Sequence, residues 1–133
     1  MRQFFILALL PTLLAGGCRL YDNRLVVVNQ TNHSIAVSQY MDSIPDLTRT
    51  SHKVRQLQDQ LPPNQSGSMM QHGMNWPSYV KNSRDGKLHL VVFALDSLKK
   101  YDTIEDLIVH RAYRVYRFDK KYLVDNKWMV VLK

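Results

Sequence analysis

Basic and aromatic side chains alternate in one segment near the end of the chain, and this composition is typical of an anion-binding surface. The segment contains Arg111, Tyr113, Arg114, Tyr116 and Arg117. Guanidinium groups bind phosphate, sulfate and carboxylate groups through paired hydrogen bonds, and the tyrosine rings could stack on sugars. On a helix, Arg111 and Arg114 would be neighbours. The spacing predicts a patch for acidic glycans or lipid headgroups, and the simpler alternative is a solvated helix face whose arginine stems cover apolar surface.

Histidine, methionine and cysteine side chains are the other groups in the sequence that could hold an ion. The five histidines show no H-x-H or H-E-x-x-H spacing, and Cys18 is the single cysteine, so the sequence predicts no zinc site. Residues 69–74 (MMQHGM) place thioether and imidazole groups together, which in a flexible loop would suit Cu(I). Methionine more often fills gaps in a core. We therefore expect no metal and no cofactor.

Serine and carboxylate side chains are the remaining candidates for catalysis. Ser97 follows Asp96 in a dense motif, but a nucleophilic serine needs a base and an oxyanion donor, and no G-x-S-x-G turn surrounds it. Serine and aspartate after a strand most often cap the next helical turn. Asp102, Glu105 and Asp106 would support glycan cleavage only if two of them converged in a cleft, whereas acids at a helix start suit its dipole. The sequence predicts that the protein is not an enzyme.

The first eighteen residues have the pattern of an export signal. Arg2 precedes an apolar run at residues 4–14, and small residues then lead into Cys18. The run is too short to span a bilayer as a stable helix. Residues 15–18 (AGGC) resemble the lipobox of bacterial lipoproteins, in which the cysteine thiol receives a diacylglyceryl group before cleavage. We predict a signal peptide over residues 1–17 and lipidation of Cys18, the alternative being an ordinary signal peptide beside an incidental cysteine.

A lipidated Cys18 would anchor the chain without a transmembrane helix. Each buried methylene contributes about 0.8 kcal/mol, so two or three acyl chains hold a protein stably. Arg19 in place of aspartate favours the outer membrane by analogy with Gram-negative sorting, and the lack of a following acidic run favours its periplasmic face. The net charge is +7, with the basic excess mainly in residues 81–133. In an exported chain this charge favours anionic lipid, acidic glycan or an envelope protein as partner, and not nucleic acid.

The rest of the sequence predicts one α+β domain over residues 25–133 after a tether at residues 18–24. Apolar or alternating runs at residues 25–28 and 34–41 flank an asparagine-rich turn, which predicts a β-hairpin. Residues 42–53 are expected to form a loop. Two readings remain for residues 54–61, a short helix or, preferred, an edge strand that ends at Pro62-Pro63. A turn is expected at residues 64–67.

The second half of the sequence carries clearer start and stop signals. Asn75 and Pro77 predict the first turn of a helix, and Asp85-Gly86 predicts a tight turn. The apolar run at residues 88–95 predicts a central strand. Thr103 and Asp106 resemble a capping box, followed by an apolar stripe that predicts one helix from Ile104 to Val115. The remaining expectations are a helical turn started by Asp119, a last strand over residues 128–132, and core positions for Trp76 and Trp128.

Several of these segments also match a family pattern. Residues 93–101 (FALDSLKKY) match F-x-x-D-[ST]-L-x-x-Y, residues 117–119 (RFD) resemble R-Y-D, and Trp128 resembles the tryptophan of a last strand. Residues 29–35 (NQTNHSI) lie where relatives have N-N-x-[ST]-x-x-x-I. With these motifs the chain resembles a family of small uncharacterised lipoproteins common in Bacteroidetes. The resemblance extends over nearly all of the mature chain and implies a fold and an envelope location, without implying any chemistry.

These observations predict a small, mainly antiparallel sheet or sandwich-like α+β domain with two or three short helices, behind a signal peptide. We expect a non-catalytic, membrane-anchored module of the cell envelope with a binding or structural role. A lipid-anchored immunity or inhibitor protein, which neutralises a secreted toxin or hydrolase, is the alternative within that class. An envelope enzyme that acts on glycans is the alternative from another class.

Overall fold

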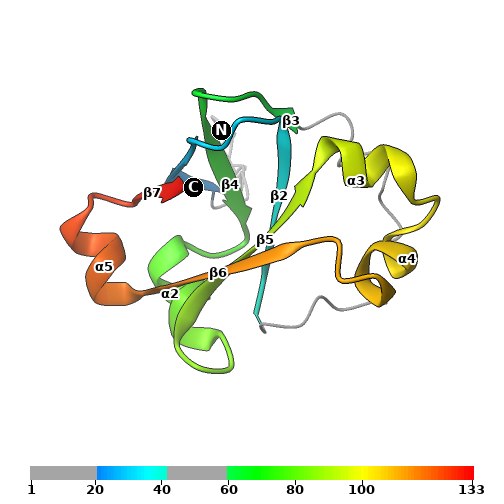
Figure 1. Ribbon diagram of the computed structural model, residues 1–133. Helices are drawn as coiled ribbons and strands as arrows, with labels where there is room; N and C mark the ends of the chain where they lie inside the picture. The colour runs from blue at the N-terminus through cyan, green and yellow to red at the C-terminus, as the bar shows by residue number, and fades with distance from the viewer. Residues whose placement is uncertain (1–20, 42–59) are drawn as a thin grey trace, which may run out of the picture.

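The computed structural model describes residues 21–41 and 60–133, and these residues form the α+β architecture expected from the sequence. Within them, seven strands build a three-stranded and a four-stranded sheet, and four short helices pack around the sheets (Figure 1). Four helices are one more than expected. The expected signal peptide and Cys18 lie outside the described residues.

The three-stranded sheet has the order β4-β1-β7. Its strands are β1 (Tyr21–Asn29), β4 (Ser66–His72) and β7 (Met129–Leu132). β1 runs antiparallel to β4 and parallel to β7. The β-branched run in β1 favours an extended backbone, and its alternation turns Leu25 and Val27 into the core. β1 begins at Tyr21, so residues 21–24, expected in the tether, belong to the strand.

The four-stranded sheet is antiparallel throughout and has the order β3-β2-β5-β6. Its strands are β2 (Ile35–Tyr40), β3 (Gln60–Leu61), β5 (Lys87–Ala94) and β6 (Arg114–Asp119). β5 is central and almost entirely buried, which confirms the prediction from its apolar run. β3 is an edge strand just before Pro62, as preferred for the end of residues 54–61. The rest of that segment and the loop expected at residues 42–53 lie outside the described residues.

The two faces of β5 contact two separate cores. One face turns Leu88 and Leu90 toward the three-stranded sheet, where both tryptophans and Val130 are also buried. The opposite face turns Val91 and Phe93 toward the helices α3 (Leu95–Lys100) and α4 (Ile104–Val109). We call the cluster beside the three-stranded sheet the first core and the cluster beside these helices the second core. The core positions predicted for Trp76 and Trp128 are confirmed. Since both cores share β5, the layout of the helices depends on this one strand.

The four helices are each six or seven residues long, and most of them begin at a capping side chain. They are α2 (Trp76–Asn82), α3 (Leu95–Lys100), α4 (Ile104–Val109) and α5 (Lys120–Asp125). The side chains of Asn75, Thr103 and Asp119 accept hydrogen bonds from the first turns of α2, α4 and α5, as predicted. The tight turn before β5 is also confirmed, with Gly86 at a φ of 70°.

The predicted β-hairpin is wrong, although both of its strands exist. β1 pairs with β4 and β7, whereas β2 pairs with β3 and β5, so the segment between them crosses from one sheet to the other. The buried side chain of Asn29 holds this crossover. Its Nδ2 donates to the carbonyls of His33 and Leu61, and its Oδ1 accepts from the N–H and the hydroxyl of Thr31. These bonds replace the cross-strand pairing that a hairpin would have.

The predicted helix from Ile104 to Val115 is also wrong in its second half. α4 ends at Val109, Arg111 adopts a left-handed conformation with a φ of 52°, and β6 starts at Arg114. The stripe that suggested a helix mixes two periods, because the positions from residue 113 onward alternate as a strand does. Val115 consequently packs against the second core from β6.

Two further expectations need correction. Asp96 and Ser97 do not cap a turn: α3 follows β5 directly with Ala94 as its N-cap, and the N–H of Leu95 is bonded to the carbonyl of Ser34. The turn expected at residues 64–67 is shorter, because β4 starts at Ser66. The following residues form this strand and not a flexible loop.

Candidate functional site

The structure does not assemble the predicted arginine patch. Arg111 lies in the turn after α4, whereas Arg114 and Arg117 lie on β6 three positions apart. Because side chains alternate along a strand, these two arginines point to opposite faces of the sheet. Tyr113 packs beside Phe93 in the second core, with ring centroids 6.2 Å apart. The patch expected from helical spacing is therefore corrected to a set of residues on separate surfaces.

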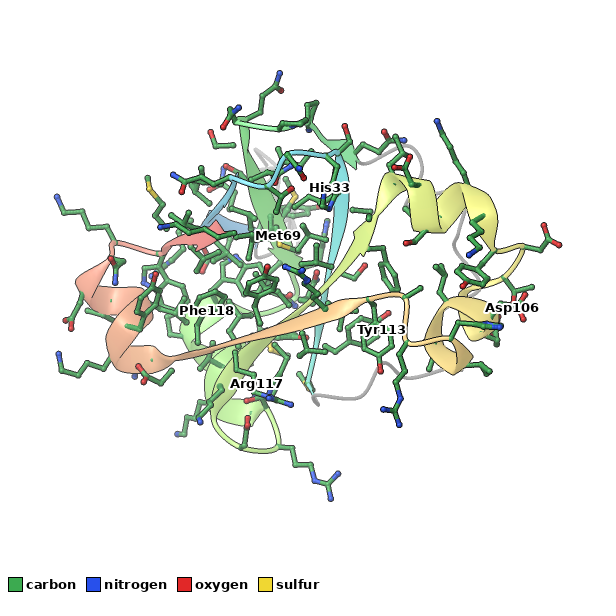
Figure 2. All side chains as sticks on the ribbon, in the orientation of Figure 1. His33, Met69, Asp106, Tyr113, Arg117 and Phe118 are labelled. Atoms are coloured by element: carbon green, nitrogen blue, oxygen red, sulfur yellow. The ribbon has the colours of Figure 1, made fainter. Side chains whose placement is uncertain are left out.

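Figure 2 shows this separation on β6. Phe118 lies on the side of the strand that faces the first core, and Arg117 lies on the opposite side, near the turn that leads into β5. In the sheet register Arg117 is opposite His89, and Tyr116 is opposite Leu90. Arg114 shares a face of β6 with Tyr116 and Phe118, whereas Arg117 lies on the opposite face.

The structure instead brings three aromatic rings together along β6 and α5. Tyr116 and Phe118 are neighbours on one face of β6, with ring centroids 6.5 Å apart and planes 5° apart. Tyr122 stacks on Phe118 at 5.2 Å and 27°. We call Tyr116, Phe118 and Tyr122 the aromatic row. Its inner side packs against the first core, and Tyr122 is exposed at its outer end.

Local sequence explains why the rings of the aromatic row meet. Alternation along β6 places Tyr116 and Phe118 on one side. Asp119 then ends the strand and caps α5, with its carboxylate accepting from the N–H of Tyr122 at 2.7 Å. Because of this cap the chain turns directly into α5, so that Tyr122, four residues after Phe118, stacks on its ring. The hydroxyl of Tyr116 donates to the carbonyl of Lys133 at 2.7 Å, which fixes the other end of the row against the end of β7.

Basic side chains border the aromatic row. Arg114 precedes Tyr116 on the same face of β6 and donates to the carbonyl of Lys133. α5 begins with Lys120 and Lys121, both exposed, and Lys121 forms an ion pair with Asp125. Aromatic rings supply flat apolar surface, and lysine and arginine supply charge for anionic groups. The arrangement suits a ligand that has flat apolar faces and negative charge, such as an acidic sugar chain.

The sequence pattern predicts only part of this surface. It includes Arg114 and Tyr116 but not Phe118 and Tyr122. Two local signals contain the missing information: the alternation from Arg114 through Phe118 is a strand pattern, and Asp119 is a helix cap. Treating residues 104–115 as one helix concealed the first signal.

A second candidate is a pair of polar side chains, Asp85 and His89, at the start of β5. His89 is 1% exposed, and its Nε2 lies 3.1 Å from a carboxylate oxygen of Asp85. Its Nδ1 is buried without a hydrogen-bond partner. Desolvation raises the pKa of Asp85, but hydrogen bonds with His89 and the N–H of Lys87 outweigh it, and the net pKa lies below its ordinary value. The hydrogen bond to Asp85 orients the imidazole of His89, and the lowered pKa keeps the Asp85 carboxylate charged at the turn before β5.

The remaining candidates do not form sites. In β4, Met69 turns toward the first core and Met70 turns outward, so the thioethers predicted to share one loop lie on opposite faces. Across the described ranges, no three His, Cys, Asp or Glu side chains are close enough together to hold a metal ion. Asp106 lies at the start of α4, where its N–H is bonded to Thr103. The described helices also include none that is long and apolar enough to cross a membrane.

Comparison of the chain with protein-family models, with curated proteins and with solved structures finds no match.

Proposed function

We propose that this chain is a non-catalytic, lipid-anchored module of the bacterial cell envelope that binds acidic glycans along the aromatic row. The observation that carries the binding role is the stacked row of Tyr116, Phe118 and Tyr122 with basic side chains beside it. The export pattern ending at Cys18 supports the anchor and the location. An exported, anchored protein meets anionic envelope polymers rather than nucleic acid, which is why an acidic glycan is the ligand class chosen.

The energetic argument depends on ring contact and charge together. An exposed aromatic ring contributes about 1 kcal/mol to a stacked contact beyond the area that it buries. Exposed charges add attraction that salt screens over about 10 Å at 0.1 M ionic strength. Binding should therefore weaken in high salt and retain a part that depends on Tyr122, the most exposed ring of the row.

The test uses the full lipidated protein in lipid nanodiscs, with polygalacturonic acid as the probe and neutral dextran as the control polymer. We expect binding to polygalacturonic acid and not to dextran. Tyr122→Ala should weaken binding about tenfold, which corresponds to about 1.4 kcal/mol. Lys120→Ala/Lys121→Ala should weaken it further, because it removes two charges beside the row.

A matched control separates specific from nonspecific attraction. Lys99→Ala/Lys100→Ala removes the same charge from α3, which packs on the second core and not beside the row. If this control variant loses as much binding as the α5 variant, general attraction to a basic protein explains the result. If Tyr122→Ala binds as well as wild type, the aromatic row is not the site. A stoichiometric protein partner that Tyr122→Ala loses would support the immunity or inhibitor alternative.

A further inference from the structure

The three-stranded sheet presents an outward face with several exposed apolar side chains. Pairing register and alternation define this face, because Leu25, Val27 and Met69 turn inward to the first core. We call the opposite side the outer face. Its apolar members are Tyr21, Val26, Val28, Met70, Met129 and Val131.

Three of the large apolar side chains that are exposed in the described part of the chain lie on this face. Tyr21 is 49% exposed, Met70 49% and Met129 48%, and these three come from three different strands. Val26 and Val131 are half-buried between them. Adjacent exposed apolar side chains that come from separate strands form a patch, and patches of this kind mark interaction surfaces.

Exposed lysines flank β7 at the border of the outer face, at positions 127 and 133. Asp22 is the single carboxylate in the three strands, and it is buried, bonded to the N–H of Trp76 and to Arg24. Lys127 and Lys133 are exposed, whereas the charge of Arg24, within β1, is paired with Asp22. An apolar face with a basic border complements a bilayer that contains anionic lipid headgroups.

The tether length limits where this face can lie. β1 begins three residues after Cys18, and three extended residues span about 10 Å. The polar headgroup layer is roughly 5–8 Å thick on each side of the hydrocarbon core. A lipid on Cys18 would therefore hold Tyr21 at or just beyond the headgroups. Tyrosine favours this interface because its ring is apolar and its hydroxyl is polar.

We propose that the outer face of the β4-β1-β7 sheet lies against the membrane that carries the lipid anchor. This inference rests on the proposed lipidation of Cys18. Docking in this way makes the domain a membrane-apposed module of fixed orientation instead of one that swings on a tether. The aromatic row, on β6 and α5, belongs to other elements and stays available to a ligand.

The test uses introduced cysteines as labelling sites in the full lipidated protein, because acylation leaves no other free thiol. Met70→Cys and Met129→Cys carry an environment-sensitive fluorophore, and Val109→Cys on α4, 76% exposed, is the control. The protein is reconstituted into vesicles of phosphatidylethanolamine and phosphatidylglycerol with nitroxide lipids. We expect a blue shift and strong quenching at positions 70 and 129, and neither at position 109.

Three measurements distinguish the ways in which this proposal could fail. If the acylated protein floats with the vesicles while positions 70 and 129 remain as solvent-exposed as position 109, the docking inference is overturned and the anchor stands. If mass spectrometry finds no lipid on Cys18, the proposed function itself fails. Labels that are already shielded in the Cys18→Ser protein without vesicles would show that protein covers the face, which also overturns lipid docking.

Discussion

Two buried polar side chains, Asn29 and Asp22, connect parts of the molecule that are distant in sequence. Asn29 uses its amide to join the end of β1, the crossover and β3 through four hydrogen bonds. Asp22 receives the N–H of Trp76, at the start of α2, and the side chain of Arg24. Buried polar groups stabilise a fold only when their hydrogen bonds are complete, and these two meet that condition.

Asn29→Ala should lower the free energy of unfolding by about 2–3 kcal/mol. The change removes the partner of the Thr31 N–H and of the Leu61 carbonyl, whereas the His33 carbonyl keeps its bond from the Thr31 hydroxyl. Each group that loses its partner costs about 1–3 kcal/mol unless it relaxes. Asn32→Ala is the control, since Asn32 lies in the same turn, is exposed and bonds only to the adjacent His33. Urea denaturation of both variants measures the difference. Equal stability of the two would show that the crossover does not depend on Asn29.

The pKa of Asp22 makes stability depend on pH. Burial raises this pKa, but hydrogen bonds from Trp76 and Arg24 lower it more, so the net pKa lies below its ordinary value. A carboxylate with a lowered folded-state pKa contributes its full stability above the unfolded-state pKa, and that contribution is lost as the pH falls through the folded-state pKa. Stability should therefore fall below about pH 4.

Asp22→Asn tests this dependence. The variant should be less stable than wild type at pH 7, and the difference should shrink as the pH falls below about 4. Thermal unfolding at several pH values measures it. A difference that stays constant across this range would show that the charge of Asp22 does not matter to the fold.

At the level of elements, local sequence signals predict most of the helices and strands, but they do not predict which strands pair with one another. The caps at Asn75, Thr103 and Asp119 and the apolar run of β5 depend on neighbours in sequence, and all are confirmed. β4 was missed because two of its four outward positions are serine and its inward ones include a glycine, which hides the alternation. The hairpin was wrong because an asparagine-rich turn suits a crossover between sheets as well as a tight return.

The turn between α4 and β6 allows us to predict the direction of a stability change. Arg111 has a φ of 52°, which costs a residue with a Cβ about 1–2 kcal/mol and costs glycine almost nothing. Arg111→Gly should therefore leave stability unchanged or raise it by up to about 1 kcal/mol. Glu105→Gly, within α4, should lower it by about 1 kcal/mol. If Arg111→Gly were as destabilising as Glu105→Gly, the helix would continue through residue 111.

At the scale of the whole molecule, the pairing of strands that are distant in sequence determines features that local sequence patterns do not predict. The parallel pairing of β1 with β7 joins the two ends of the described chain, and no local signal predicts it. The α+β fold class and the location of the cores follow from composition and alternation. The formation of the aromatic row depends on how β6, α5 and β7 contact one another. The candidate site was therefore recovered only in part, through Arg114 and Tyr116, because its other members are recognisable only once the strand and the cap are in place.

The proposed anchor and the two proposed surfaces are consistent with one orientation of the molecule. A lipid on Cys18 and the outer face would place the three-stranded sheet toward the membrane. The aromatic row lies on β6 and α5, which are not part of the three-stranded sheet. Tyr116 connects β6 to the end of β7 through its hydrogen bond to Lys133. This layout depends first on Cys18, because an unanchored domain would have no reason to keep one face on a bilayer.

The most direct test of the account is the mass of the N-terminal peptide of the mature protein, purified from membranes of a bacterial host that processes lipoproteins. We predict a peptide that begins at Cys18 and carries the added mass of a diacylglyceryl group, with residues 1–17 absent, and a Cys18→Ser variant that no longer partitions into membranes. A mature protein that keeps residue 1, or that begins elsewhere with an unmodified Cys18, would contradict the lipid anchor and the orientation built on it.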